Sequence, residues 1–130
     1  TAAFDAIMEA FGMPKGNDAQ KADRHDAIQA ATLGAMKTPL EVAERSLESM
    51  AIMAEMAENG NPNSVTDAGV GALCARTAVL GAVMNVRVNA ADLEDRNTAD
   101  EMLARCVELE AAAEEQERSV RDRVSAVLGV

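Results

Sequence analysis

The chain has 130 residues, a formal net charge of −10 and a hydrophobic content of 48%. This length suits one domain, residues 1–130, and the acidity argues against a nucleic-acid binder because phosphate backbones would be repelled. With no Trp or Tyr and only Phe4 and Phe11 as aromatic residues, large aromatic burial is excluded. We therefore expect a second subunit, most simply in a homodimer, to add stability.

Helical periodicity runs along the sequence, and strand-like alternation is absent from it. The pattern predicts an all-α bundle of about five helices, over about 1–11, 17–37, 39–59, 65–89 and 98–128.

Capping signals set these predicted starts. Asn17 or Asp18 can accept the free amides of the second helix. Thr38 followed by Pro39 resembles a third helix start, with proline at the first position. Thr98 with Glu101 has the spacing of a capping box.

The fourth predicted helix is apolar nearly all round, which is typical of a helix at the centre of a bundle. Polar residues stand at the two ends of one stripe, and small residues lie between them. The stripe consists of Asp67, Gly71, Ala75, Ala78, Ala82, Asn85 and Asn89. The small residues favour a close helix-packing seam over a ligand groove.

The polar ends of this stripe are candidates for chemistry. Asp67, near the helix start, fits either a capping carboxylate or a general base. Asn85 and Asn89 fit either a bridge between helices or ligand contacts, since a buried amide must be hydrogen-bonded. Asp67 and Asn85 are 18 residues apart, or about 27 Å along a helix. They serve either a long ligand or a contact between subunits.

Other site types receive little support. Cys74 and Cys106 are expected to be buried thiols, and the single His25 does not support a zinc site. Arg76 interrupts the longest apolar stretch, so no bilayer-spanning segment and no membrane partner are predicted. No signal peptide is recognised, which favours a cytoplasmic protein, and the start at Thr1 suggests an upstream segment that is not included.

Three blocks in order, AFDAIMEAFGMPKG, TPLEVAE and GNPNSVTDAGVGALCARTAVLGAVMNVRVN, resemble the cyclodeaminase-cyclohydrolase family of folate one-carbon metabolism. The resemblance covers nearly all of the chain. It implies an all-helical, dimeric enzyme, with its site in a cleft associated with the dimer, that acts on a tetrahydrofolate derivative and needs no metal or organic redox cofactor. The favoured activity is hydrolysis of 5,10-methenyltetrahydrofolate to 10-formyltetrahydrofolate.

Two alternatives stay open: formimidoyltetrahydrofolate cyclodeaminase activity, which releases ammonia, and a non-enzymatic helical dimerisation module. The resemblance gives Asp67 a catalytic role. The substrate-binding residues that it implies are Lys15, Arg24, Asn61, Asn85 and Asn89, with the two cations facing the glutamate tail of the folate. Asn63, in the polar loop before the fourth predicted helix, is a further substrate-binding candidate, with capping of the turn as the alternative. It also implies that the N-terminal part of the family domain, with a further acidic residue proposed for catalysis, lies upstream of Thr1.

Overall fold

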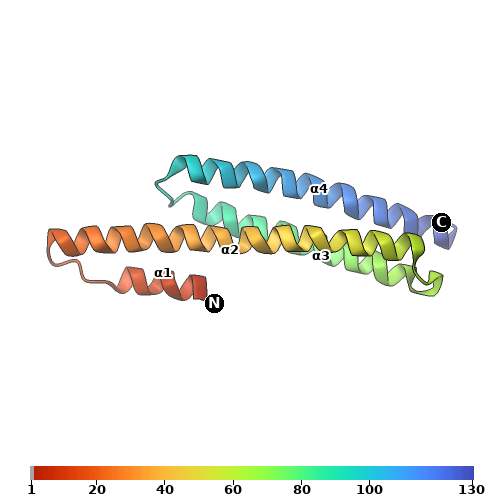
Figure 1. The fold of residues 1–130 in the computed structure, drawn as a ribbon, viewed down its shortest axis with the longest axis horizontal. Helices are drawn as coiled ribbons and strands as arrows, with labels where there is room; N and C mark the ends of the chain where they lie inside the picture. Colours follow the sequence, from red (N-terminus) through yellow and green to blue (C-terminus); the bar gives the residue numbers. More distant parts are fainter. Residues whose placement is uncertain (1) are drawn as a thin grey trace.

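The computed structural model describes residues 2–130, so the predicted start at Thr1 lies outside the described residues. These residues form four α-helices and one short 3₁₀ helix, and they contain no strand. In chain order the elements are α1 (Ala2–Gly12), α2 (Asp18–Asn59), η1 (Pro62–Ser64), α3 (Val65–Ala90) and α4 (Arg96–Leu128). The all-α prediction is confirmed. The three long helices form an elongated bundle, with α1 folded back on the first part of α2 (Figure 1).

The core of the bundle repeats every seven residues, which keeps one stripe of each helix facing its neighbours. The buried heptad positions are Met36, Ala43, Met50 and Ala57 in α2, Val65, Ala72, Val79 and Val86 in α3, and Ala99, Cys106, Ala113 and Val120 in α4. Five of these twelve side chains are alanine. The helices can therefore approach closely without large aromatic residues.

α2 continues through Pro39, so the prediction of two helices meeting at residues 37 and 38 is wrong. Proline cannot donate the helical hydrogen bond and usually costs about 3 kcal/mol or more inside a helix. Met36 and Ala43, on either side of Pro39, are both 0% exposed. Packing on both sides of the proline therefore keeps α2 in one piece, and the described residues have four α-helices instead of five.

The predicted helix caps are partly confirmed. Asn17 accepts a hydrogen bond from the amide of Gln20, as expected for the cap of α2. The cap of α4 is Asp95, which accepts from the amide and the hydroxyl of Thr98. Thr98 is therefore inside the helix, and its prediction as the cap is wrong. α3 begins without a side-chain cap, because the residue at its cap position, Ser64, makes no such hydrogen bond.

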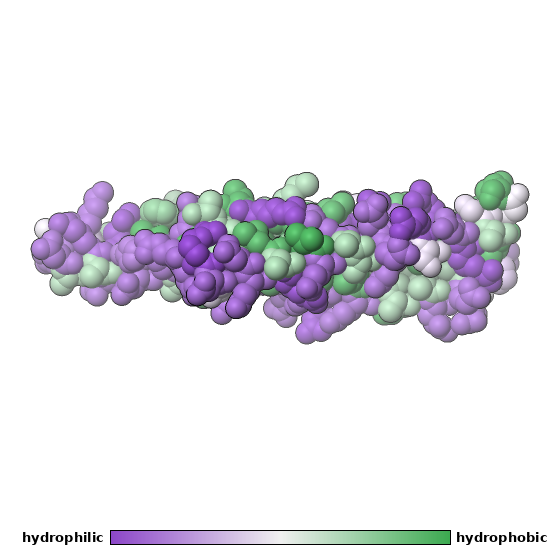
Figure 2. Space-filling model, turned by 90° about the horizontal axis from the view of Figure 1, so that it is seen from above, coloured by the Kyte–Doolittle hydropathy of each residue, from purple (hydrophilic) through white to green (hydrophobic). Residues whose placement is uncertain are grey.

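α3 is buried on one side and exposed on the other, so its predicted place at the centre of the bundle is wrong for this chain. α3 contacts α2 on one flank and α4 on the other. The large apolar residues on its open side are Val70, Leu73, Met84 and Val88. Phe4 and Phe11 of α1 are also exposed. Figure 2 shows one long face of the molecule, where hydrophilic residues predominate and apolar residues gather near the middle.

Two further expectations need correction. Cys106 is buried, and burial raises the pKa of its thiol, but Cys74 is exposed. The segment Pro62–Ala90 is long and apolar enough to cross a membrane by length and composition, despite Arg76. A core helix of a soluble bundle passes the same test, and one side of α3 is packed against α2 and α4.

Candidate functional site

Asn85 and Asn89 line the same groove, which lies between α1, α2 and α3 and has a volume of about 460 Å³. We call it the asparagine groove. Its apolar wall comes from Phe4, Ile7 and Val42, while α3 also contributes small residues to its floor. The full lining is Ala3, Phe4, Ile7, Ala35, Thr38, Pro39, Val42, Ala78, Gly81, Ala82, Asn85 and Asn89. The predicted seam of small residues on α3 therefore borders a groove along part of its length.

The side-chain amides of the two asparagines are hydrogen-bonded within α3. The Asn85 Nδ2 donates to the carbonyl of Gly81 at 2.9 Å, and the Asn89 Nδ2 donates to the carbonyl of Asn85 at 2.8 Å. These bonds within α3 use the amide nitrogens and leave the Oδ1 atoms as acceptors. The asparagines are therefore not bridges between helices.

Pro39 also lines the groove and changes the hydrogen bonding of α2 there. In a regular helix the amide of residue 39 would donate to the carbonyl of Ala35, but proline has no amide hydrogen. Ala35, Thr38 and Pro39 all line the groove. The Ala35 carbonyl therefore lacks its usual helical donor at the groove wall. Sequence reasoning missed these residues, although the block TPLEVAE contains two of them.

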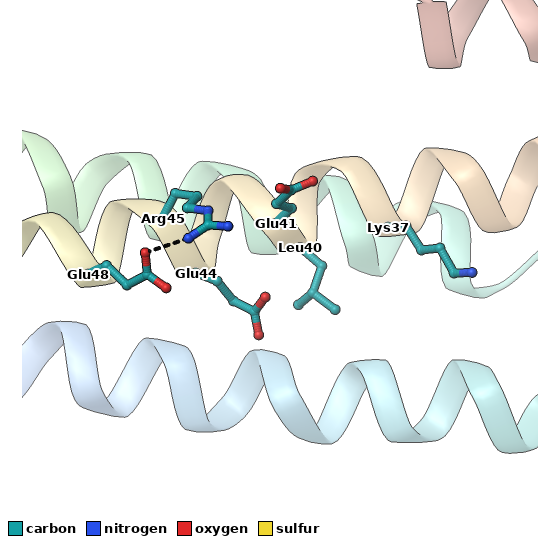
Figure 3. Close-up of a pocket in the computed structure, with 6 residues that line it drawn as sticks. All are labelled: Lys37, Leu40, Glu41, Glu44, Arg45 and Glu48. Atoms are coloured by element: carbon teal, nitrogen blue, oxygen red, sulfur yellow. Dashed lines mark hydrogen bonds and ion pairs between the residues drawn. The ribbon is translucent and has the colours of Figure 1, made fainter.

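A second pocket, along α2, has the wrong charge for an anionic ligand. It is lined by Lys37, Leu40, Glu41, Glu44, Arg45 and Glu48. Figure 3 shows Arg45 turned toward Glu48, and the two groups are 2.9 Å apart. Arg105 of α4 binds Glu44 at 3.0 Å. The pocket therefore contains three carboxylates, two of which are paired with Arg45 and Arg105, and we interpret it as a solvated charged surface between α2 and α4.

Asn61, Asn63 and Asp67 lie together at the start of α3. The Asn61 Oδ1 accepts from the amide of Asn63 at 3.0 Å, so this asparagine caps the 3₁₀ turn. Asn63 and Asp67 are exposed. Asp67 is on the first turn of α3, where the helix dipole favours a carboxylate.

Lys15 and Arg24 lie at the other end of the bundle, where α1 joins α2. The Arg24 guanidinium donates to the carbonyl of Phe11 at 3.2 and 3.4 Å, and it stacks 5.5 Å from the centre of the Phe11 ring. Arg24 therefore fastens α1 to α2, and it keeps further donors free for a ligand. Lys15 is exposed in the connecting loop.

The predicted site residues thus occupy three separate places. Asn85 and Asn89 share the asparagine groove, whereas Asp67 is on the same uninterrupted helix, about 27 Å from Asn85. The α1–α2 corner and the α2–α3 loop are separated by the 42 residues of α2, which is roughly 60 Å. A single copy of the described chain does not bring the predicted carboxylate to the predicted amides.

Known sequences resemble this chain over most of its length. The sequence model of the formiminotransferase-cyclodeaminase family matches residues 1–108. The methenyltetrahydrofolate cyclohydrolase of Methylorubrum extorquens is 43% identical over 101 residues, which cover 78% of this chain and 49% of that protein. The formimidoyltransferase-cyclodeaminase of Mus musculus is 33% identical over 93 residues, 72% of this chain and 17% of that protein. The formimidoyltransferase-cyclodeaminase of Sus scrofa is 32% identical over 124 residues, which cover 95% of this chain and 23% of that protein. The chain thus spans about half of the first relative and a smaller part of the others.

Proposed function

The chain belongs to the formiminotransferase-cyclodeaminase family, and we propose that it binds a tetrahydrofolate one-carbon adduct in the asparagine groove. The reaction we propose is hydrolysis of 5,10-methenyltetrahydrofolate to 10-formyltetrahydrofolate. The observation that carries the proposal is the family match over residues 1–108, which includes every residue of the groove. The first relative, at 43% identity, is named for this hydrolysis.

The groove suits such a ligand chemically. Its volume of about 460 Å³ falls in the range of small-molecule sites. Phe4, Ile7 and Val42 offer an apolar wall for a flat ring, and the Oδ1 atoms of the asparagines offer acceptors for its N–H groups. The methenyl adduct carries positive charge at its bridging carbon, which neutral oxygens attract without forming a tight ion pair.

The glutamate tail is proposed to run along α2 toward Arg24. Arg24 lies 11 residues before Ala35 on the same helix, or about 17 Å away. Its free guanidinium donors, and the ammonium of Lys15 nearby in sequence, suit carboxylates. Asn61 and Asn63, at the distant end of α2, are proposed to contact ligand from a second copy.

In the proposed reaction, water adds to the bridging carbon while a base takes one of its protons. The hydroxyl group formed on that carbon then loses its proton as the bond to N5 breaks, N5 takes a proton, and the carbon stays on N10 as a formyl group, so that one proton is released overall. A positioned carboxylate can contribute roughly 10²- to 10⁴-fold as such a base, and our candidate is Asp67 of a second copy, because Asp67 of the same copy is too far from the groove. Water supplies every atom that is added, so the proposed chemistry needs no cofactor.

The second candidate is the cyclodeaminase reaction, favoured by the relatives named formimidoyltransferase-cyclodeaminase at 32 and 33% identity. In that reaction the adduct cyclises and its nitrogen leaves as ammonia. The same groove would bind the formimino adduct, and the same carboxylate, Asp67, would transfer the protons. We further propose that the chain acts as a cytoplasmic homodimer built from one domain over 1–130, without a nucleic-acid or membrane partner.

Two assays test this proposal on the purified chain. With 5,10-methenyltetrahydrofolate, hydrolysis removes the methenyl absorbance without ammonia; with the formimino adduct, cyclodeamination releases ammonia. Calorimetry then compares binding to the native chain, to Asn85→Ala and to Asn59→Ala, an exposed asparagine at the end of α2. We expect weaker binding for Asn85→Ala alone. A chain that binds neither adduct overturns the proposal and favours a non-enzymatic dimerisation module.

A further inference from the structure

The connection between α2 and α3 begins with the dipeptide Asn59–Gly60, in which the last residue of α2 is followed by a glycine. Both residues are exposed. The backbone nitrogen that follows an asparagine can attack the side-chain amide carbon and expel ammonia, and a side chain on the following residue hinders this attack. Because glycine has no side chain, it hinders the attack least. The sequence and the exposure of this dipeptide therefore leave Asn59 open to modification.

The other six asparagines of the chain are less open to this reaction. Asn61 precedes a proline, which has no amide hydrogen to lose. The side-chain amides of Asn85 and Asn89 are hydrogen-bonded within α3, and both residues are followed by residues with side chains. The remaining three are also followed by residues with side chains, and they are Asn17, Asn63 and Asn97. Asn59 alone in the sequence precedes a glycine.

The end of α2 requires the glycine at position 60. The amide of Gly60 donates to the carbonyl of Met56 at 3.0 Å. A Cβ at Gly60 would lie 2.3 Å from that carbonyl oxygen, so a side chain at this position is strongly disfavoured. The fold therefore keeps at position 60 the residue that gives Asn59 the least protection.

Few contacts hold Asn59 in its helical conformation. Its Nδ2 donates to Glu55 Oε1 at 3.0 Å, and the following amide, that of Gly60, donates to Met56. The attack requires the peptide unit between residues 59 and 60 to turn, which breaks both bonds at an exposed helix end. Helix ends open in this way at little cost. The preceding residue, Glu58, lies 2.9 Å from Arg123 of α4, so this ion pair ties the last turn of α2 to the bundle.

We propose that Asn59 is a site of spontaneous deamidation, which converts it through a cyclic succinimide into aspartate or isoaspartate. The nitrogen of Gly60 gives its proton to hydroxide and forms a bond with the side-chain carbon Cγ of Asn59. The bond from Cγ to Nδ2 breaks, and this nitrogen takes a proton from water and leaves as ammonia. Water then adds to one of the two ring carbonyls and opens the ring.

The modification changes the charge at the end of α2. A carboxylate at position 59 would face the carboxylate of Glu55, which accepts a hydrogen bond from the amide in the unmodified chain. Like charges four residues apart destabilise a helix, and the helix dipole disfavours an anion at the C-terminal end. Isoaspartate also lengthens the main chain by one carbon shortly before Asn61, which caps η1. The modified chain should therefore have a looser α2–α3 connection and a lower melting temperature.

Incubation of the native chain at pH 8, followed by peptide mass spectrometry, tests the site. Asn59 should be the first asparagine to show the mass change of deamidation, and the product should separate into the aspartate and isoaspartate peptides. Asn59→Gln should abolish this first change, whereas Asn97→Gln should leave its rate unaltered. Earlier deamidation at any other asparagine overturns the proposal.

Two arginine variants test whether the end of α2 controls the rate. Arg123→Ala removes the ion pair with Glu58 and should speed deamidation at Asn59 severalfold. Arg105→Ala removes a similar pair with Glu44 in the middle of α2 and should leave the rate unchanged. Equal rates in the two variants would refute the opening of the helix end as the controlling step. The modified chain can be isolated by its extra negative charge on an anion exchanger, and a melting temperature equal to that of the unmodified chain would refute the loosening of the connection.

Discussion

Removing the Arg76 side chain should destabilise the bundle, because it leaves the carboxylate of Glu117 buried without its best partner. Glu117 is 1% exposed on α4, and Arg76 of α3 donates to its Oε2 at 3.0 Å. Arg121 lies 2.9 Å from the other carboxylate oxygen, but that oxygen receives no hydrogen bond of good geometry. The Arg76 pair is therefore the interaction that compensates the burial of this charge.

Breaking a buried ion pair on one side costs about 3–5 kcal/mol. Arg121 keeps some attraction after the change, so we expect the lower end for Arg76→Ala, about 3 kcal/mol. With a urea dependence of about 2 kcal/mol per M, the unfolding midpoint should fall by roughly 1.5 M. The assay is urea unfolding followed by circular dichroism, at one fixed protein concentration because association adds to apparent stability.

Two variants control this experiment. Arg87 pairs with Glu110 at a more open position, where the side chains are exposed by 44 and 26%, so Arg87→Ala should cost less than about 1 kcal/mol. The double change Arg76→Met with Glu117→Met should leave stability within about 1 kcal/mol of native or raise it, since no charge stays buried. If Arg76→Ala costs no more than Arg87→Ala, the carboxylate is solvated and the reasoning is refuted.

Three further predictions concern the ends of the helices. The hydrogen bond to Glu94 raises the pKa of His25. The contact therefore stabilises the fold fully below pH 6.5, and this stabilisation is lost as the pH rises through the raised pKa. In melting temperatures measured between pH 6 and 9, His25→Gln should remove this pH dependence of stability. Asn17→Ala should cost about 1 kcal/mol in urea unfolding, against no change for Asn63→Ala, whose side chain caps no helix. A Cβ at Gly60 would lie 2.3 Å from the Met56 carbonyl oxygen, so Gly60→Ala should lower the free energy of unfolding by about 1–3 kcal/mol. Gly12 has open space around it, so Gly12→Ala should leave stability unchanged. Equal melting temperatures for the two variants would contradict this prediction.

The helical class and the bounds of α3 follow from the sequence, because the helix predicted over 65–89 matches Val65–Ala90 to within one residue. The predicted break at Thr38 is wrong because a capping signal is local, whereas the packing that keeps α2 continuous extends over several turns. The heptad from Met36 through Ala43 to Met50 passes Pro39 without a change of phase. A register that is continuous on both sides of a proline indicates one helix, since a break would rotate the second half away from its neighbours.

The two sides of α3 could not be told apart from composition. Val83 is 0% exposed and Met84 is 66% exposed, yet both are apolar and adjacent in the chain. Which side is buried depends on where α2 and α4 lie, and this is decided by contacts across the bundle. The polar anchors of those contacts, such as Arg76 with Glu117, are 41 residues apart in sequence.

The spacing of the candidate site was predictable, but its groove was not. Because Asp67 and Asn85 are on one helix, their separation of about 27 Å follows from counting residues. The groove requires α1 to fold back so that Phe4 and Ile7 come beside Asn85, which no local pattern encodes. Pro39 bears both on the continuity of α2 and on the groove. The proline that resembles the start of a helix instead removes one helical hydrogen bond within α2, the one to the carbonyl of Ala35, and Ala35 lines the same groove as the two asparagines.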